Sequence, residues 1–470
     1  MPWGDGLRPV RMQRVALLAP REVLREVLVE VADEGTVALD EAIPNGDAPA
    51  HSSPAVARLQ HLGAGGIAAP ALTRTSPNLD RWENDGRIDL IAGEAQLEQR
   101  SGQAVTRGRV AALTGWMPAD DVPRLVDRVA DKGGAVVPMP RPAGMQPPTL
   151  LPQEGAAHDF APLTEMYASV PYADVNPSLL AGLAYVVMFG IMFADVGHGA
   201  LLVLAAVAIR RQWSRRLARL RPAWLFLAGA GVASICFGAL YGEFFGPTHV
   251  VPVLWLAPLD HPIPLLGAAV AVGAMLLAGA YALGTVNRFR EGGWRVAVYA
   301  PSGLAGATLF LGLAAVAGGV YLDLLWLVPL GAVMTAGGVA VAYLGLLAAA
   351  GGGAAGAAQA GIELFDLVVR LGSNLISFAR LAAFGLTHAA LGQVVWHATT
   401  GLSGHGPLGV VGAVAIFAVG NTVTFALEAL VAGIQALRLE YYELFSRIFA
   451  TEGTPFRPWH VPLAPTEASC

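Results

Sequence analysis

The chain has 470 residues, of which 54% are apolar and only 14% are charged. Soluble globular domains carry about 25% charged residues, so a wholly soluble protein is excluded and much of the chain is expected to lie in a membrane. The first 177 residues hold 23 of the 35 acidic residues, which predicts a water-soluble domain ahead of a membrane bundle. The two cysteines cannot form a disulfide framework, and the start of the chain shows no signal peptide. The first domain is therefore expected to stay in the cytosol.

Residues 1–147 alternate between apolar patterns typical of strands and of helices. They predict a small cytosolic α/β domain, of ferredoxin-like type, in which residues 41–109 leave room for only a short arm. Residues 148–177 are rich in proline and are expected to form an extended linker. Strands are expected at 14–20, 35–39 and 110–118, and helices at 23–31 and 120–129.

The membrane domain is expected at 178–450, as a mostly α-helical bundle. Its first apolar run, 178–209, would measure about 48 Å as one helix, well beyond the roughly 30 Å of hydrocarbon. A hairpin fits better, with a turn at 194–199 that contains two glycines, Asp195 and His198. The arginine-rich segment 210–221 is then cytosolic, as the positive-inside rule favours.

Six further crossings alternate from this loop, which gives eight in total and places both termini in the cytosol. The last two runs are too long to stand upright and are expected to tilt. A Gly/Ala segment at 350–361 is expected to be a loop, and 451–470 a cytosolic tail. The six crossings are expected at 223–246, 263–287, 297–319, 322–348, 362–399 and 408–445.

Arg380 lies deep within an apolar run and has no acid on its own helical face. A guanidinium at membrane depth costs roughly 2.5–3.5 kcal/mol on insertion scales and cannot lose its proton. One interpretation is an arginine that extends to the membrane interface. The other is a fixed positive charge that meets carboxylates from another helix or chain. On a helical wheel, Ser373 and Thr387 share its face.

The last predicted helix carries a polar stripe on one face. Lipid offers no hydrogen-bond partners, so such a stripe faces either protein or a water-filled path. The stripe therefore indicates inter-helix hydrogen bonding or a hydrated route for an ion or proton, in which Glu428 would be the relay. The stripe consists of Asn421, Thr424, Glu428 and Gln435, with Arg438 close to it.

Other polar residues have weaker signals. His388 could titrate near neutral pH or act only as a hydrogen-bonding partner. Asp195 and His198 are interpreted as caps of their turn, and Glu243 as interfacial. The sequence shows no nucleotide-binding motif, no metal-ligand spacing and no hydrolase motif, so no cofactor, metal or nucleic acid is expected. If ATP is used, another chain binds it.

Taken together, these residues resemble the membrane-embedded a subunit, or subunit I, of V-type and A-type rotary ATPases. The resemblance covers almost the whole chain, and the motifs occur in the family's order. It rests on Ser377-Phe378-Ala379-Arg380-Leu381 followed by His388, on Glu428 with Arg438, on Phe193–Gly199, Tyr241–Gly246 and Thr451–Phe456, and on Gly115–Pro118 and Pro148–Leu151.

The resemblance implies a stator subunit with two offset half-channels, through which protons, or in some members sodium, reach carboxylates on a rotor ring. Arg380 would separate the half-channels, Glu428 and His388 would carry the ion, and Arg438 would support the barrier. Asn421, Thr424 and Gln435 would line the path, together with Ser373, Thr387, Asp195, His198 and Glu243. The implied partners are ring proteolipids, peripheral-stalk subunits, an ATP-binding head and lipid, in a prokaryotic plasma membrane.

The chain departs from the family in two ways. Phe378 replaces a tyrosine beside the arginine, and the arm of the first domain is short. The alternatives are a stand-alone secondary ion transporter and a scaffold that no longer transports. Transporters commonly carry internal repeats, and none is visible here. In each case the chain is not expected to be an enzyme by itself.

Overall fold

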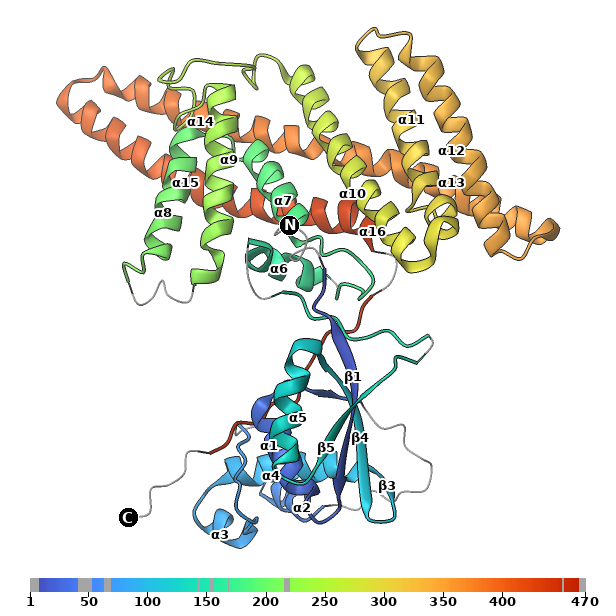
Figure 1. Ribbon diagram of the computed structural model, residues 1–470. Helices are drawn as coiled ribbons and strands as arrows, with labels where there is room; N and C mark the ends of the chain where they lie inside the picture. The colour runs from blue at the N-terminus through green and yellow to red at the C-terminus, as the bar shows by residue number, and fades with distance from the viewer. Residues whose placement is uncertain are drawn as a thin grey trace. The chain divides into compact units, whose positions relative to one another are not determined.

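The computed structural model describes residues 8–40, 53–62, 69–142, 144–152, 156–167, 169–214, 220–449 and 452–464. The chain divides into two compact units (Figure 1). The α/β unit consists of Pro9–Leu150 and Gly453–Cys470, and the membrane unit of Met1–Arg8 and Leu151–Glu452.

The α/β unit is built on an antiparallel sheet in the order β2-β4-β1-β5, with β3 paired to β4. This order and the chain path β1-α1-β2-β4-α5-β5 agree with the ferredoxin-like layer that the sequence predicts. The strands are β1 (Met12–Pro20), β2 (Ala38–Leu39), β3 (Val105–Arg107), β4 (Val110–Pro118) and β5 (Ala135–Met139).

Helices of this unit cover the sheet with apolar faces. Val27 and Leu28 of α1 and Leu125 and Val129 of α5 are fully buried in one core with the strands. Gly35 ends α1 in the left-handed region, at a φ of 62°, which suits glycine. The helices are α1 (Leu24–Glu34), α2 (Pro54–His61), α3 (Leu79–Asn84), α4 (Ile88–Gly102) and α5 (Val122–Ala130).

The described part of the C-terminal segment packs within the α/β unit. The backbone N–H of Trp459 donates to the carbonyl of Val37, and that of Val461 to Ala32. Leu463 forms a parallel bridge with Leu72. The sequence shows no alternation of apolar and polar residues in this segment, because isolated backbone hydrogen bonds of this kind do not require one.

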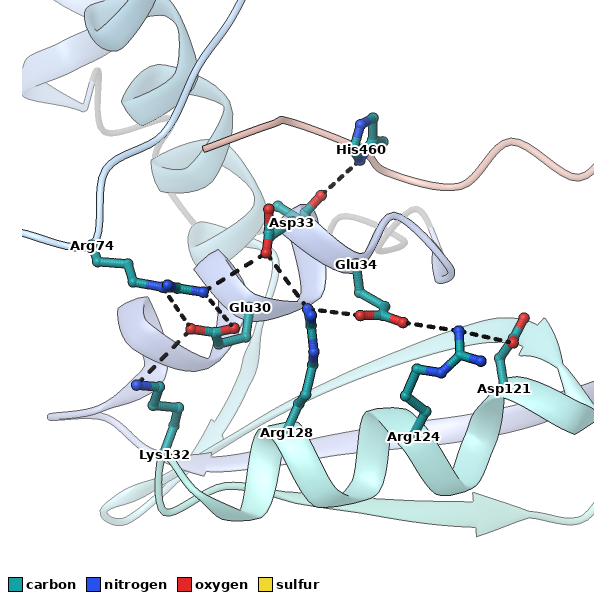
Figure 2. A network of polar contacts seen from close by, with 10 residues as sticks. Glu30, Asp33, Glu34, Arg74, Asp121, Arg124, Arg128, Lys132 and His460 are labelled. Carbon is teal, nitrogen blue, oxygen red and sulfur yellow. Dashed lines mark hydrogen bonds and ion pairs between the residues drawn. The ribbon is translucent and has the colours of Figure 1, made fainter. Parts of the chain in front are cut away.

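Acidic residues of α1 are held by bases from two segments, and a histidine from a third segment bonds to the α1 backbone (Figure 2). Arg74 Nε lies 3.0 Å from Glu30 Oε1, and Arg128 Nη1 lies 2.7 Å from Glu34 Oε2. His460 donates from Nδ1 to the carbonyl of Ala32 at 3.1 Å. The contacts join α1 to α5, to the segment before α3 and to the C-terminal segment.

The described part of the membrane unit is mostly helical. Six of its helical runs are long and apolar enough to cross a membrane, and α7 and α8 are shorter apolar helices. Its helices are α6 (Ala156–Tyr167), α7 (Ser178–Met192), α8 (Val196–Arg210), α9 (Trp224–Tyr241), α10 (Pro262–Tyr299), α11 (Leu304–Tyr321), α12 (Leu327–Ala349), α13 (Gly353–Ser377), α14 (Ala379–Ser403), α15 (Gly406–Leu439), a π-helix (Glu440–Phe445) and α16 (Ser446–Ile448).

The predicted hairpin at 178–210 is present as α7 and α8. Each has 15 residues, or about 22 Å at 1.5 Å per residue, so neither alone matches a full hydrocarbon core. The last two long runs lie side by side and cross α7 to α10 steeply in Figure 1, which agrees with the predicted tilt.

Three expectations about local structure were wrong in part. The Gly/Ala segment at 350–361 is helical from Gly353 onward, because alanine-rich sequence favours helix once a neighbour packs on it. The predicted extended linker contains α6, which holds Pro162 inside it. The single run expected at 362–399 divides at Phe378, directly before the turn that carries Arg380.

Candidate functional site

Arg380 lies in the first turn of α14 and is partly buried. Its Nη1 is buried and has no hydrogen-bond partner. The described residues place no carboxylate oxygen within 4.0 Å of this guanidinium. The structure therefore keeps the positive charge available in an apolar part of α14.

A groove with a volume of about 880 Å³ runs beside this arginine. Most of the side chains that line it are small or apolar, so a helix from another chain could approach closely. Ser373 lines the same groove, as its shared helical face predicts, whereas Thr387 does not and donates to the carbonyl of Ala383. The lining residues are Pro262, Ile263, Leu266, Ser373, Ile376, Ser377, Ala379, Arg380, Ala382, Ala383 and Leu386.

Glu443 is a buried acid that the sequence analysis did not assign to the site. It lies in the π-helix after α15, within electrostatic range of both Arg380 and Arg438 and near the hydroxyl of Ser377. Arg438 itself is exposed in the last turn of α15. The wider turn of a π-helix, with i→i+5 hydrogen bonds, shifts side chains away from the positions that a regular wheel gives.

A second group of polar side chains, here called the polar centre, consists of Asp195, His198, Glu243, His388 and Glu428. His388 Nδ1 contacts Glu428 Oε2, and His388 Nε2 lies 3.9 Å from Glu243 Oε2. His388 is 3% exposed and Glu243 is 5% exposed. These residues come from the α7–α8 turn, the segment after α9, α14 and α15.

Asp195 caps α8, as the sequence predicts, and also links two segments. Its Oδ1 accepts from the backbone N–H of His198 at 2.8 Å, and its Oδ2 accepts from that of Gly246 at 2.9 Å. Gly246 has a φ of 91°, and a Cβ there would lie 2.9 Å from the carbonyl oxygen of Gly392. Glycine therefore allows the segment after α9 to approach α14 closely.

His198 differs from a simple cap residue. It is 2% exposed, and neither of its ring nitrogens has a hydrogen-bond partner. Its ring packs against Phe193 and Phe245 and lies 5.7 Å from the His388 ring, measured between centroids. The side chain therefore points into the polar centre with neither nitrogen hydrogen-bonded, and its Nδ1 lies 3.8 Å from Asp195 Oδ1.

Of the polar stripe on α15, only Glu428 belongs to the polar centre. Asn421 and Thr424 are buried one to two turns before Glu428, and Asn421 Nδ2 donates to the carbonyl of Phe417. Gln435 lies two turns beyond Glu428, and its Oε1 is buried without a partner. One face of the helix thus serves both the polar centre and the region near Arg438.

A third buried polar group joins Asp174, before α7, to the part of α10 that precedes its kink at Gly292 and Gly293, where the sequence predicted a linker and a loop. Asp174 and Asn287 are fully buried, and Arg288 Nη2 lies 2.7 Å from Glu291 Oε1. Burial, followed by the neighbouring Glu291 carboxylate, raises the pKa of Asp174 to about 7. The sequence signal here was the group of arginines after the span, Arg288, Arg290 and Arg295, which the positive-inside rule already explained.

The chain matches the family model of the V-type ATPase 116 kDa subunit at residues 103–252 and 359–461, which together make up more than half of its length. The chain belongs to this family. The second match contains Arg380, His388, Glu428 and Arg438, and the resemblance seen in the motifs is confirmed. With the helices described above, this defines a multi-pass membrane protein.

Similar proteins named A-type ATP synthase subunit I occur in several archaea. The protein from Thermococcus kodakarensis is 28% identical over 373 residues, which cover 74% of this chain and 54% of the relative. That from Methanocaldococcus jannaschii is 28% identical over 81% of this chain and 59% of its own length. That from Halobacterium salinarum is 27% identical over 67% and 51%. The chain spans about half the length of the curated relatives it matches.

Proposed function

We propose that this chain is the ion-translocating a subunit of a V/A-type rotary ATPase. In this role it guides protons, or sodium, to carboxylates on a rotor ring, while other subunits hydrolyse or synthesise ATP. One observation carries the proposal above the rest: Arg380 has a permanent charge, has no acidic partner within ion-pair distance among the described residues, and lines a groove open to another helix.

The electrostatics of Arg380 suit this task. A carboxyl group in an apolar rotor helix is favoured in its neutral form, because burial disfavours charge. Beside a guanidinium the ionised form becomes favourable, so the carboxyl group releases its proton as it passes the groove. Since arginine cannot take up that proton, it also blocks a direct route across the membrane.

The polar centre supplies one half-channel in this proposal. Glu428 and His388 are in contact, and Glu243 lies close enough for a proton to pass with a small rearrangement or through one water molecule. Asp195 and His198 extend the path toward the α7–α8 turn, and Asn421 and Thr424 continue it along α15.

The region between Arg380 and Arg438 forms the second part of the path. Glu443 lies in the field of both arginines, so it balances their charge while leaving Arg380 without an ion pair. Arg438 then supports the barrier, with Gln435 beside it. Ser373 lines the groove toward the rotor, and Thr387 lies on α14 outside that groove.

This assignment implies the partners of the chain and its location in the cell. The partners are the proteolipids of the rotor ring, the peripheral-stalk subunits and, through them, an ATP-binding head. The basic segment 210–221 favours a cytosolic position, which places both termini in the cytosol and the bundle in the plasma membrane.

The experiment is ATP-driven proton uptake by reconstituted complexes that carry Arg380→Ala. We expect uptake to fall to background while the complex still assembles, because the rotor carboxylate no longer meets a cation. Arg370→Ala is the matched control, since Arg370 is exposed on α13 and paired with Asp366 at 2.7 Å. Normal uptake by the Arg380 variant would reject the proposed function.

A further inference from the structure

We propose that the polar centre binds a divalent transition-metal ion, with Zn²⁺ as the best fit, through Asp195, His198 and His388. One donor atom from each of these three residues lies within 4.8 Å of the other two. A bound ion would also obstruct the passage of protons. This consequence rests on the proposed function, whereas the binding of the metal does not. The sequence does not indicate the site, because Asp195 and His198 lie at the α7–α8 turn whereas His388 lies far along the chain on α14.

The donor set selects the class of ion. Two imidazoles and one carboxylate suit Zn²⁺ and related transition metals, whereas sodium, magnesium and calcium prefer oxygen ligands. Zinc–nitrogen distances of about 2.0–2.1 Å place two ligand atoms roughly 3–3.5 Å apart on one ion. The three side chains therefore need only a small inward movement, which rotation of the imidazole rings can supply.

His198 is the observation that points to a ligand. It is 2% exposed, neither ring nitrogen has a hydrogen-bond partner, and the nearest carboxylate oxygen, Asp195 Oδ1, lies 3.8 Å from Nδ1, beyond hydrogen-bond distance. Buried polar atoms are almost always hydrogen-bonded or bound to an ion, so an unpaired buried imidazole needs a partner. A metal ion between His198 and His388 satisfies one nitrogen of each.

The surroundings orient the other ligands as a metal site requires. Metal-binding histidines commonly direct their second nitrogen to a carboxylate, and His388 does so through its Nδ1 contact with Glu428, which leaves Nε2 for the ion. Two backbone N–H groups hold the Asp195 carboxylate in place.

Glu243 supplies the fourth position. Its Oε2 is buried without a partner and lies 3.9 Å from His388 Nε2. The carboxylates of Asp195, Glu243 and Glu428 surround the centre, and no arginine or lysine lies within ion-pair distance of them among the residues that the structure describes. A divalent cation therefore offsets charge that the protein itself leaves uncompensated.

The test uses the full-length chain purified in detergent without a polyhistidine tag. Zn²⁺ is titrated after chelator treatment, and bound metal is counted by mass spectrometry after dialysis. Co²⁺ is added in parallel, because its visible ligand-field absorption reports nitrogen ligation. We expect one tight site per chain, which is lost in His198→Ala and His388→Ala.

Two further variants separate the site from general effects. Glu428→Gln keeps the size of the side chain but weakens the hydrogen bond behind His388, so affinity should fall about 10–100-fold. His397→Ala is the matched control, because His397 is exposed on the same helix and donates to the carbonyl of Gln393. It should bind as the unmodified chain does.

The proposal fails if no metal remains after dialysis, if His198→Ala binds normally, or if His397→Ala loses binding equally. None of these results depends on proton transport. A chain that binds Zn²⁺ as described while Arg380→Ala still pumps would reject the proposed function and retain the metal site.

Discussion

The two buried acids of α1 and α4 in the α/β unit each have a basic partner, whereas the membrane unit buries acids that accept no hydrogen bond. Glu94 binds Arg25 through both carboxylate oxygens, at 2.9 and 2.7 Å, and Glu30 is held by Arg74 and Lys132. In the membrane unit, both carboxylate oxygens of Asp174 and of Glu440 are buried without a partner.

The difference indicates what each unit does with charge. A paired charge holds elements together, and the α/β unit places such pairs between helices that also share one apolar core. An unpaired charge in a low-dielectric interior costs free energy. Such a charge is retained where a mobile ion or a group from another chain neutralises it. The following predictions test that contrast.

Glu428→Gln should give the largest effect. The amide cannot take up and release a proton, so ATP-driven proton uptake by reconstituted complexes should fall at least tenfold, in line with the usual size of an acid–base contribution. Assembly should persist, because the side chain keeps its shape. Glu363→Gln, at an exposed position on α13, should pump normally.

If uptake by Glu428→Gln were normal, its contact with His388 would be structural. The polar centre would then resemble the α/β unit, where such contacts serve stability, and the contrast between the two units would not hold.

Glu94→Ala should destabilise the α/β unit by about 2–4 kcal/mol, because it leaves the partly buried Arg25 without its partner. Hydrogen exchange of the α1 and α4 amides in the purified chain measures this loss. Glu22→Ala breaks a solvent-exposed pair with Arg109 and should change stability by less than about 1 kcal/mol. Equal effects would show that burial of the pair does not matter.

Asp174→Asn should change the pH dependence of stability in the membrane unit. The pKa of Asp174 is raised from 3.8 to about 7, so the folded state binds more protons than the unfolded state between these values. Its contribution is present below about pH 4 and is lost as the pH rises through about 7. The variant should melt a few degrees higher than the unmodified chain at pH 8, and at nearly the same temperature at pH 4.

Thermal melting in detergent at the two pH values measures this difference, with Asp366→Asn as a control at an exposed aspartate. A shift of the same size at both pH values would contradict the assigned direction of the pKa.

Much of the architecture could be predicted from the sequence, because it depends on local patterns. Apolar runs located the long helices, glycine with Asp195 located the turn between α7 and α8, and alternating periods located the α/β unit. The motifs around Arg380 and Glu428 indicated the family. These signals are local in the sequence, so they can be recognised without knowing which helices and strands contact one another.

The polar centre could not be predicted, because it depends on packing between distant segments. A helical wheel places His388 about 80° from Arg380 but does not show that it meets Glu428, 40 residues away in the sequence. The π-helix that positions Glu443 changes the helical period, and α6 lies in a proline-rich stretch that predicts an extended chain.

The most direct measurement of the central claim is disulfide cross-linking between this groove and the rotor ring. Cys236 and Cys470 are first replaced by serine, and a cysteine is then introduced either at Ala383, which is exposed and lines the groove, or at Val333, which is exposed on α12 outside it. The ring carries a cysteine one turn from its carboxylate. We predict that Ala383→Cys cross-links to the ring and Val333→Cys does not. Cross-links at Val333 alone would contradict the account, because the rotor would then pass a face that carries no fixed cation.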